Sequence, residues 1–260
     1  MIRRALITGG SAGLGAALVQ ELMTAGYHIT ILDRDTPATP HPDVRFLKTD
    51  LGQTNTLPVI LEHLQPDEQF DLVIFNAGIS AVGAFETIER AHLETLINTN
   101  LHAPIALTHL LMVQNRLAND ASLIFIGSLS NRLGYPGAAV YAASKQGIEA
   151  FAHSLRKARQ YRVLCVLPGP LDTAHARRYA PAGSKSGART APAHLARRVL
   201  AHNKRSGILY ANAPQFLAGL VGALMPQTAT ALMRANLFAK LQMAPPVTDA
   251  APDPVQPAGT

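Results

Sequence analysis

A glycine-rich turn between an apolar run and an amphipathic run constrains the fold of this chain more than any other feature. Residues 3–8 are expected to form a strand, and residues 16–23 repeat apolar side chains with helical spacing, with Gly26 as a C-cap. The turn between them reads Gly9-Gly10-Ser11-Ala12-Gly13-Leu14-Gly15. This order predicts a phosphate-binding unit, because glycines admit a pyrophosphate and the helix start offers N–H groups. The turn lacks Gly-Lys-Ser/Thr, which excludes an ATP-type P-loop, and alone it is equally compatible with tight packing.

The strand expected at residues 27–32 ends at Asp33, twenty residues beyond Gly13. A partner for a ribose 2′-hydroxyl is expected at this distance. The carboxylate of Asp33 would accept from ribose hydroxyls and repel a 2′-phosphate, whereas Arg34 beside it could do the opposite. No basic residue lies inside the turn, where Ala12 sits, so the sequence favours NAD over NADP.

Strand-like runs alternate with helical runs along the chain. The strand-like runs are residues 3–8, 27–33, 43–48, 71–76, 121–127, 161–167 and 207–211. This alternation predicts an α/β fold with a parallel sheet of about seven strands and helices on both faces. A length of 260 residues with 48% hydrophobic side chains suits one domain with a full core.

Ser128, Tyr141 and Lys145 form a candidate proton-transfer site. Tyr and Lys four residues apart project from one face of a helix. An ammonium beside a phenol favours the phenolate, and a Tyr with an ordinary pKa of about 10 is a poor acid or base at neutral pH. The Ser128 hydroxyl, from a separate strand end, could donate to a carbonyl oxygen. By itself the pair is also compatible with a helix that carries one buried Tyr and one solvated Lys.

Taken together, these features resemble the short-chain dehydrogenase/reductase family in its single-domain branch, from about Leu6 to Thr173. The motifs that carry the resemblance are Thr8-Gly9-x-x-x-Gly13-x-Gly15, Asp50-Leu51, Asn76-Ala77-Gly78, Asn100, Ser128, Tyr141-x-x-x-Lys145 and Pro168-Gly169-Pro170-Leu171-Asp172-Thr173. The resemblance implies a Rossmann-type doubly wound sheet and an NAD(P)-dependent oxidoreductase that interconverts a secondary alcohol and a ketone.

The resemblance also implies a role for each motif residue. Tyr141 would transfer the hydroxyl proton, Lys145 would lower the pKa of Tyr141 and hold the nicotinamide ribose, and Ser128 would bind the substrate oxygen. Asn100 would support a proton relay at a backbone kink. The implied cofactor contacts are Gly9, Ser11, Ala12, Gly13, Leu14, Gly15, Asp33, Arg34, Asp50, Leu51, Asn76, Ala77, Gly78, Tyr141, Lys145, Pro168, Gly169, Leu171 and Thr173. Asp50 or Thr173 could instead be an ordinary helix cap, and Asn76 and Gly78 could only shape a turn.

The resemblance to the family becomes weaker after Thr173. Residues 174–190 lie where the family keeps a mobile substrate lid, and residues 214–243 predict an appended helical pair. Residues 1–243 are therefore expected to form one domain, followed by a disordered Pro/Ala-rich tail at 244–260. The apolar stretch 216–225 could line a pocket, pack in a dimer or touch a membrane surface, with a core or interface helix as the default.

The remaining composition excludes several classes of protein. The single Cys, Cys165, lies in an apolar strand and is expected to be an inert core residue, and no Cys/His cluster predicts a metal site. The net charge is +6, but aromatic residues are few, so a solvated basic surface is favoured over nucleic-acid binding. No apolar run approaches a membrane span of about 18–20 residues. The chain starts directly with a strand, which predicts no signal peptide and a cytoplasmic protein. A homodimer or homotetramer is expected as well.

Three alternatives stay open at this point. An NADP-dependent carbonyl or ketoacyl reductase would use Arg34. A cofactor-binding regulator without turnover usually lacks the Tyr or the Lys, and a sugar-nucleotide epimerase is disfavoured by the glycine spacing and the chain length. The expected pocket walls, Leu129, Ser130, Leu133, Tyr135 and Pro170, suit a hydrophobic or cyclic ketone or alcohol as the small-molecule substrate.

Overall fold

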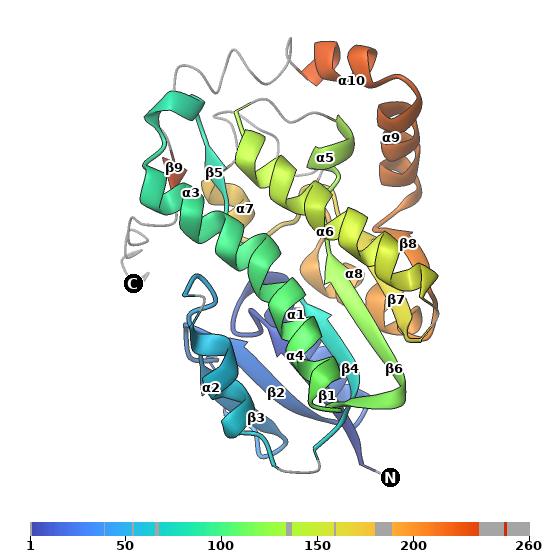
Figure 1. Ribbon diagram of the computed structural model, residues 1–260. Helices are drawn as coiled ribbons and strands as arrows, with labels where there is room; N and C mark the ends of the chain where they lie inside the picture. The colour runs from blue at the N-terminus through green and yellow to red at the C-terminus, as the bar shows by residue number, and fades with distance from the viewer. Residues whose placement is uncertain are drawn as a thin grey trace, which may run out of the picture.

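A seven-stranded parallel sheet forms the centre of the molecule (Figure 1). The computed structural model describes residues 2–38, 40–53, 55–65, 68–133, 137–158, 160–179, 189–233 and 247–248. The strands are β1 (Arg3–Thr8), β2 (Tyr27–Asp33), β3 (Val44–Lys48), β4 (Phe70–Phe75), β6 (Leu117–Ile126), β7 (Arg162–Leu167) and β8 (Gly207–Tyr210). Their order is β3-β2-β1-β4-β6-β7-β8, which confirms the predicted doubly wound fold.

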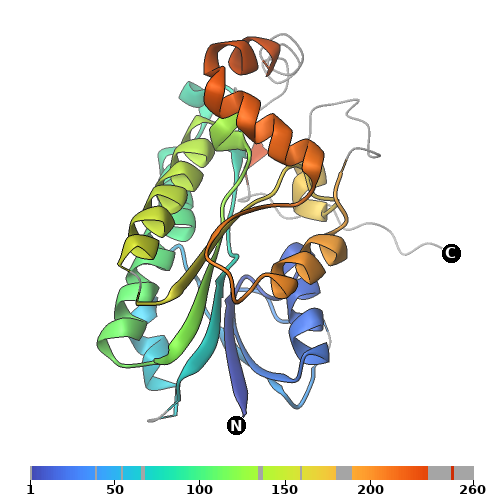
Figure 2. The ribbon, with the colours of Figure 1, turned by 90° about the vertical axis from the view of Figure 1, so that its right-hand side faces the viewer.

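Helices cover both faces of the sheet, as the alternating pattern predicts. Figure 2 shows the sheet nearly edge-on, with α1 (Gly13–Thr24) and α8 (Pro192–Ala201) on one side. The other side is covered by α2 (Thr56–Glu62), α3 (Arg90–Ile97), α4 (Ala103–Val113) and α6 (Ala139–Lys157). Gly26 follows α1 with a positive φ of 73°, as a C-terminal glycine does.

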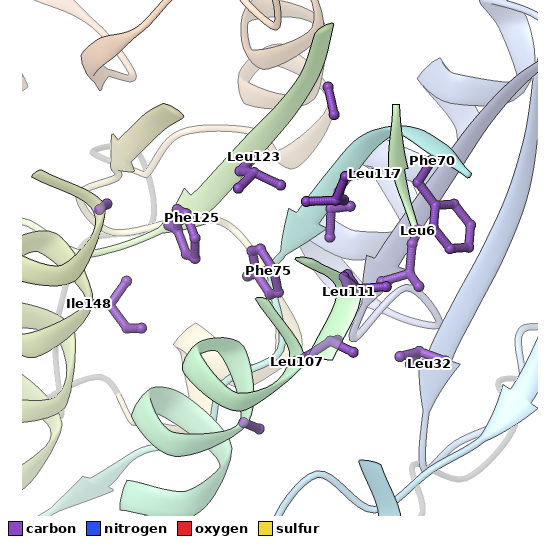
Figure 3. Close-up of a cluster of buried hydrophobic side chains, with 14 of the residues drawn as sticks. Leu6, Leu32, Phe70, Phe75, Leu107, Leu111, Leu117, Leu123, Phe125 and Ile148 are labelled. Carbon is purple, nitrogen blue, oxygen red and sulfur yellow. The ribbon is translucent and has the colours of Figure 1, made fainter. Parts of the chain in front are cut away.

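Two hydrophobic cores lie on the two faces, because neighbouring strand residues point in opposite directions. In β1, Leu6 packs toward α4 and α6, whereas Ala5 and Ile7 pack toward α1 and α8. Figure 3 shows the first of these cores, in which the rings of Phe75 and Phe125 stack with centroids 4.5 Å apart.

The strand order reverses between β1 and β4, which places a crevice at their carboxyl ends. From β1 the chain moves outward to β2 and β3, and then returns to β4 on the other side of β1. The glycine turn after β1 and the Asn76-Ala77-Gly78 turn after β4 therefore meet at this crevice.

Two short strands form an additional antiparallel pair that the sequence did not predict. Ala81–Val82 (β5) pairs with Val247–Thr248 (β9). The expectation of a disordered tail therefore does not hold at Val247 and Thr248, because β5 offers them backbone partners. The other residues of 244–260 lie outside the described part of the chain.

The C-terminal helices are α9 (Ala213–Leu224) and α10 (Pro226–Met233), and residues 234–243 of the predicted pair lie outside the described part. The inner face of α9 packs on the domain, and its outer face exposes large apolar side chains, namely Phe216, Leu217, Leu220, Val221 and Leu224. The sequence from Ser206 to Met233 contains no charged residue and no His. In the part of the chain that the structure describes, no helix has the length and apolar character needed to cross a bilayer.

Candidate active site

The glycine turn is built so tightly that backbone atoms form its walls. A Cβ on Gly15 would lie 1.8 Å from the Gly9 carbonyl oxygen, a separation that no side chain tolerates. Gly9 itself has a φ of +66°, and a Cβ there would lie 2.8 Å from Ala77 Cα. Gly9 and Gly15 are therefore required for the close packing of this turn against the turn after β4.

The start of α1 offers donors to an anion. The N-cap residue, Ala12, has no side chain that caps the helix, and the first turn contains no acidic residue. Leu14 is buried in the core and so anchors this turn of the helix. A Cβ on Gly13 would lie 3.3 Å from Thr173 Cγ2, which brings the turn after β7 against the glycine turn. These features fit a dinucleotide whose pyrophosphate lies at the helix start.

Asp33 lies at the end of β2 and faces the glycine turn. Its carboxylate accepts hydrogen bonds from the N–H of Ser11 at 2.9 Å and from the N–H of Asp35 at 3.3 Å. The exposed guanidinium of Arg34 donates to the carboxylate of Asp35 at 3.4 Å. Asp33 is therefore held at the crevice, while the charge of Arg34 is partly offset by Asp35.

The turn after β4 is fixed by hydrogen bonds to β1. Thr8 Oγ1 accepts from the N–H groups of Asn76 and Ala77, both at 3.0 Å, and Asn76 Nδ2 donates to the Gly9 carbonyl at 2.7 Å. A Cβ on Gly78 would lie 3.1 Å from Lys145 Nζ. The structural role considered for Asn76 is therefore present in the structure, and Gly78 makes room for the lysine.

Asp50 and Leu51 follow β3 and lie on the same side of β1 as Asp33. The Asp50 carboxylate accepts from the N–H of Gly52 at 2.9 Å, so it stabilises a turn rather than capping α2. Leu51 is buried.

The structure brings Ser128, Tyr141 and Lys145 together beside the crevice. Tyr141 and Lys145 lie on α6, and Ser128 follows β6 and hydrogen-bonds to the Tyr141 side chain. Ser128 Oγ accepts from the N–H of Ser130 at 3.1 Å and contacts Ser130 Oγ at 2.8 Å. The Ser130 N–H therefore helps to hold the Ser128 hydroxyl beside Tyr141.

Asn100 lies in a π-helical turn, η2 (Asn98–His102), which interrupts the path from α3 to α4. Its Oδ1 accepts from the Ile79 N–H at 2.8 Å, and its Nδ2 donates to the Ile79 carbonyl at 2.9 Å and to Ser144 Oγ at 3.1 Å. The expected backbone kink is thus a π turn, and Asn100 joins the turn after β4 to α6.

Burial dominates the acidity of both groups on α6. It raises the pKa of Tyr141, and the hydrogen bond with Ser128 opposes that rise. Burial also lowers the pKa of Lys145 from 10.5 to about 8, because an ammonium is poorly solvated there. The sequence predicts a lowered pKa for Tyr141, which is wrong for this structure. The Lys145 ammonium donates to the Ile126 carbonyl at 2.9 Å and lies 5.9 Å from the centre of the Tyr141 ring.

A small cavity lies beside Lys145 and Asn100. Its volume is about 10 Å³, and its walls include Thr8, Thr99, Asn100 and Lys145. This volume is enough for one water molecule, and the wall carries the polar groups that a water needs. The cavity therefore connects the buried ammonium of Lys145 with Asn100.

The wall in front of Tyr141 is apolar. Val82, Ala138 and Tyr179 form a buried cluster that packs against Tyr141, and the Tyr179 ring lies 4.9 Å from that of His175. Sequence reasoning missed these three residues, although an aromatic at the start of the lid segment was a signal for Tyr179. Tyr135, the side chain of Leu133 and residues 180–188 of the lid segment lie outside the described part.

The turn after β7 meets the end of the lid segment. Leu171 pairs with Thr190, and the Pro168 carbonyl accepts from the N–H of Leu129 at 2.9 Å. Thr173 Oγ1 accepts from the Ala176 N–H at 3.0 Å, so Thr173 caps α7 (Ala174–Arg178) as the alternative considered for it requires. Thr190, and Gln215 from α9, are further residues that sequence reasoning missed as parts of this site.

Cys165 lies buried in β7, and burial raises the pKa of its thiol to about 12. A thiol with this pKa stays protonated near neutral pH, as an inert core residue does. In the described part of the chain, no cluster of three or more His, Cys, Asp and Glu side chains is placed to hold a metal ion.

Comparison with known proteins agrees with this geometry. Residues 3–183 match the family model described as short chain dehydrogenase. The acetoacetyl-CoA reductase of Acinetobacter sp. (strain RA3849) is 30% identical over 176 residues, which cover 62% of this chain and 70% of the relative. A short chain dehydrogenase from Burkholderia cenocepacia J2315 in complex with NADP has a TM-score of 0.76 at 22% identity, covering 89% of this chain and 97% of that chain. The 3-ketoacyl-(acyl-carrier-protein) reductase from Brucella melitensis complexed with NADH has a TM-score of 0.66 at 18% identity, covering 81% and 97%.

Proposed function

The chain belongs to the short chain dehydrogenase family, and on that premise we propose that it is an NAD(P)-dependent oxidoreductase interconverting a secondary alcohol and a ketone. The observation that carries the proposal is the convergence of Ser128, Tyr141, Lys145 and Asn100 beside the glycine turn. A regulator without turnover would not need this hydrogen-bonded set.

The cofactor would lie along the carboxyl ends of the strands. The pyrophosphate would contact the glycine turn and the start of α1, and Asp33 would hold the adenosine ribose. Asp50 and Leu51 would lie near the adenine, and Tyr141 and Lys145 near the nicotinamide ribose. The turns of Asn76-Ala77-Gly78 and of Pro168, Gly169, Leu171 and Thr173 would complete the site. When bound, the nicotinamide would supply or accept the hydride.

Tyr141 would give its proton to the ketone oxygen during reduction and take it back during oxidation. Ser128 would donate to the same oxygen and orient the substrate. Lys145 and Asn100, with a water in the cavity between them, would return a proton to Tyr141. The Ser128–Tyr141 hydrogen bond and the cavity beside Lys145 support these roles.

One observation favours a biosynthetic ketoreductase as the second candidate. The similar proteins named above include an acetoacetyl-CoA reductase and a 3-ketoacyl-(acyl-carrier-protein) reductase. The apolar wall of Val82, Ala138 and Tyr179 supports an apolar or cyclic substrate in either case.

We propose NAD as the preferred cofactor, with NADP as the alternative. The Asp33 carboxylate, held by the Ser11 N–H, would repel a 2′-phosphate, and Arg34 is paired with Asp35. Separate titrations with NADH and NADPH, followed by nicotinamide fluorescence, test this proposal. Tighter binding of NADPH would transfer the selectivity to Arg34 and favour the ketoreductase.

Replacement of Tyr141 by Phe tests the acid–base role. We expect kcat to fall by at least a thousandfold, because the hydroxyl proton is lost, while NADH affinity changes by less than about threefold. Tyr161→Phe, at the far end of β7, is the matched control and should retain full turnover. Full turnover of Tyr141→Phe with the cofactor bound would contradict the mechanism.

We also propose that the protein works as a homodimer or homotetramer. The exposed apolar side chains of α9 lie in a stretch without charge, from Ser206 to Met233. Two copies of a chain with a net charge of +6 repel each other least at such a surface, which supports a second copy as its partner. Sedimentation equilibrium measures the oligomeric state.

A further inference from the structure

Gln215 lies where three segments of the chain meet. These segments are the turn after β7 at Gly169, the end of the lid segment at Thr190, and the first turn of α9. The side chain of Gln215 is only 9% exposed, although glutamine is usually found at the surface. A buried amide needs partners for its polar atoms, so its contacts reveal what it holds.

Both ends of the Gln215 amide are engaged. Its Oε1 accepts from the Gly169 N–H at 2.8 Å, and its Nε2 donates to Thr190 Oγ1 at 3.1 Å. The backbone N–H of Gln215 donates to Asn212 Oδ1 at 2.9 Å, which fixes the residue at the start of α9. One side chain therefore joins the turn after β7 to the return of the lid segment.

The packing around Gly169 points to the same junction. A Cβ on Gly169 would lie 2.8 Å from Cδ and from Nε2 of Gln215. Thr190 is also tied to the turn through backbone bonds, because its N–H donates to the Pro170 carbonyl and its carbonyl accepts from the Asp172 N–H, both at 2.9 Å. The turn and the end of the lid segment are thus one unit, and Gln215 secures that unit to α9.

Helix α9 also supports the segment that carries Ser128. A Cβ on Gly219 would lie 2.7 Å from Tyr210 Cε1 and 3.2 Å from Leu129 Cδ2, so the helix packs closely on both residues. Leu129 in turn donates its N–H to the Pro168 carbonyl at 2.9 Å. The same helix therefore contacts the turn after β7 and the residue next to Ser128.

We propose that Gln215 is a positioning residue that sets the nicotinamide side of the cofactor site by holding the turn at Gly169 against Thr190. The inference rests on the proposed function, in which this turn borders the nicotinamide. Gln215 acts through the backbone of the turn. It follows that α9 determines the affinity for the nicotinamide half of the cofactor and leaves the affinity for the adenosine half unchanged.

The test compares NADH with ADP-ribose, which has the same adenosine diphosphate but no nicotinamide. For Gln215→Leu, which keeps the size of the side chain and removes both hydrogen bonds, we expect the Kd of NADH to rise about tenfold. The Kd of ADP-ribose should stay within about twofold of the wild-type value. Titration calorimetry measures both ligands on the full chain.

Gln227→Leu is the matched control, because Gln227 is exposed on α10 and the same replacement there should change neither Kd. A second variant covers the possibility that Gln215→Leu does not fold. Thr190→Val removes the acceptor for Nε2 while keeping its shape, and we expect it to weaken NADH binding about threefold with ADP-ribose binding unchanged.

Each outcome separates the inference from the proposed function. If Gln215→Leu weakens NADH and ADP-ribose equally, or weakens neither, the positioning role is wrong while the oxidoreductase proposal stands. If the wild-type protein binds neither NADH nor ADP-ribose, the proposed function is wrong, and the inference about Gln215 is then wrong as well. A selective loss of NADH affinity in Gln215→Leu and Thr190→Val, with Gln227→Leu unchanged, supports the role of Gln215.

Discussion

At Gly15 the surrounding atoms leave room for a hydrogen atom on Cα but not for a side chain. A Cβ there would meet the Gly9 carbonyl at 1.8 Å and the amide nitrogen of Asn76 at 2.7 Å. That amide already donates to the same Gly9 carbonyl, so the two turns share one set of contacts. The floor of the crevice is therefore made of atoms that cannot move apart without opening the junction between β1 and β4.

Replacement of Gly15 by Ala tests this close approach. The free energy of unfolding should fall by about 2–4 kcal/mol, because the methyl group forces α1 away from Gly9. Affinity for NADH should fall at least a hundredfold, since α1 carries the expected pyrophosphate site. Urea unfolding and nicotinamide fluorescence measure the two effects. Ala16→Ser, at the exposed neighbouring residue, should change stability by no more than about 0.5 kcal/mol, and equal behaviour of the two variants would refute the argument.

At the scale of elements, the π-helical turn η2 directs the side chain of Asn100 inward. One extra residue in the turn allows Asn100 to reach both Ile79 and Ser144. It thereby connects the turn after β4 with the helix that bears Tyr141 and Lys145. The π turn thus fixes the position of α6 relative to the turn after β4.

Asn100→Asp separates the two functions of this amide. The carboxylate still accepts from the Ile79 N–H but cannot donate to the Ile79 carbonyl or to Ser144 Oγ. We expect kcat to fall ten- to a hundredfold, because α6 loses a tie to the π turn and the Lys145 cavity gains a negative charge. Steady-state kinetics measures this loss. Asn98 lies in the same π turn as Asn100, and its side chain donates to the Gly52 carbonyl. Asn98→Ala should therefore leave kcat within about threefold of the wild-type value. A similar loss of kcat in both variants would argue against a specific role of Asn100.

The elements differ in how well the sequence predicts them. The five inner strands and the edge strands β3 and β8 follow from local patterns, and all four proposed catalytic residues follow from the motifs that carry the family resemblance. Gln215 and Val82 carry no such pattern, because their partners lie far away in the chain. The Gly169–Gln215 contact, for example, spans 46 residues and depends on how α9 returns to β7. The pair β5–β9 escaped prediction for the same reason.

At the scale of the whole molecule, Lys145 links the site to the pH dependence of folding. Its pKa of about 8 lies below the ordinary value of 10.5, so the folded state gives up this proton first. Between pH 8 and 10.5 the unfolded chain therefore binds more protons, and the free energy of unfolding rises with pH. The raised pKa values of Cys165 and Tyr141 act in the opposite direction at higher pH, because the folded state keeps those protons longer.

Comparison with Lys145→Met isolates this effect. Between pH 8 and 9 the wild-type free energy of unfolding should gain about 1 kcal/mol relative to the variant, which lacks the titrating group. Urea titrations at the two pH values measure the difference. A gap between the two proteins that does not change with pH would show that Lys145 titrates normally in the folded protein.

The contact between Gln215 and Gly169 also orders events during synthesis of the chain. A ribosome that adds about 5–20 residues per second needs roughly 2–10 s to pass from Gly169 to Gln215. During that interval the nascent chain already contains the glycine turn and Tyr141, but it lacks the Gln215 side chain that accepts from the Gly169 N–H. Gln215, which is translated after the glycine turn, Tyr141 and Gly169, thus fixes the turn after β7 at the edge of the pocket.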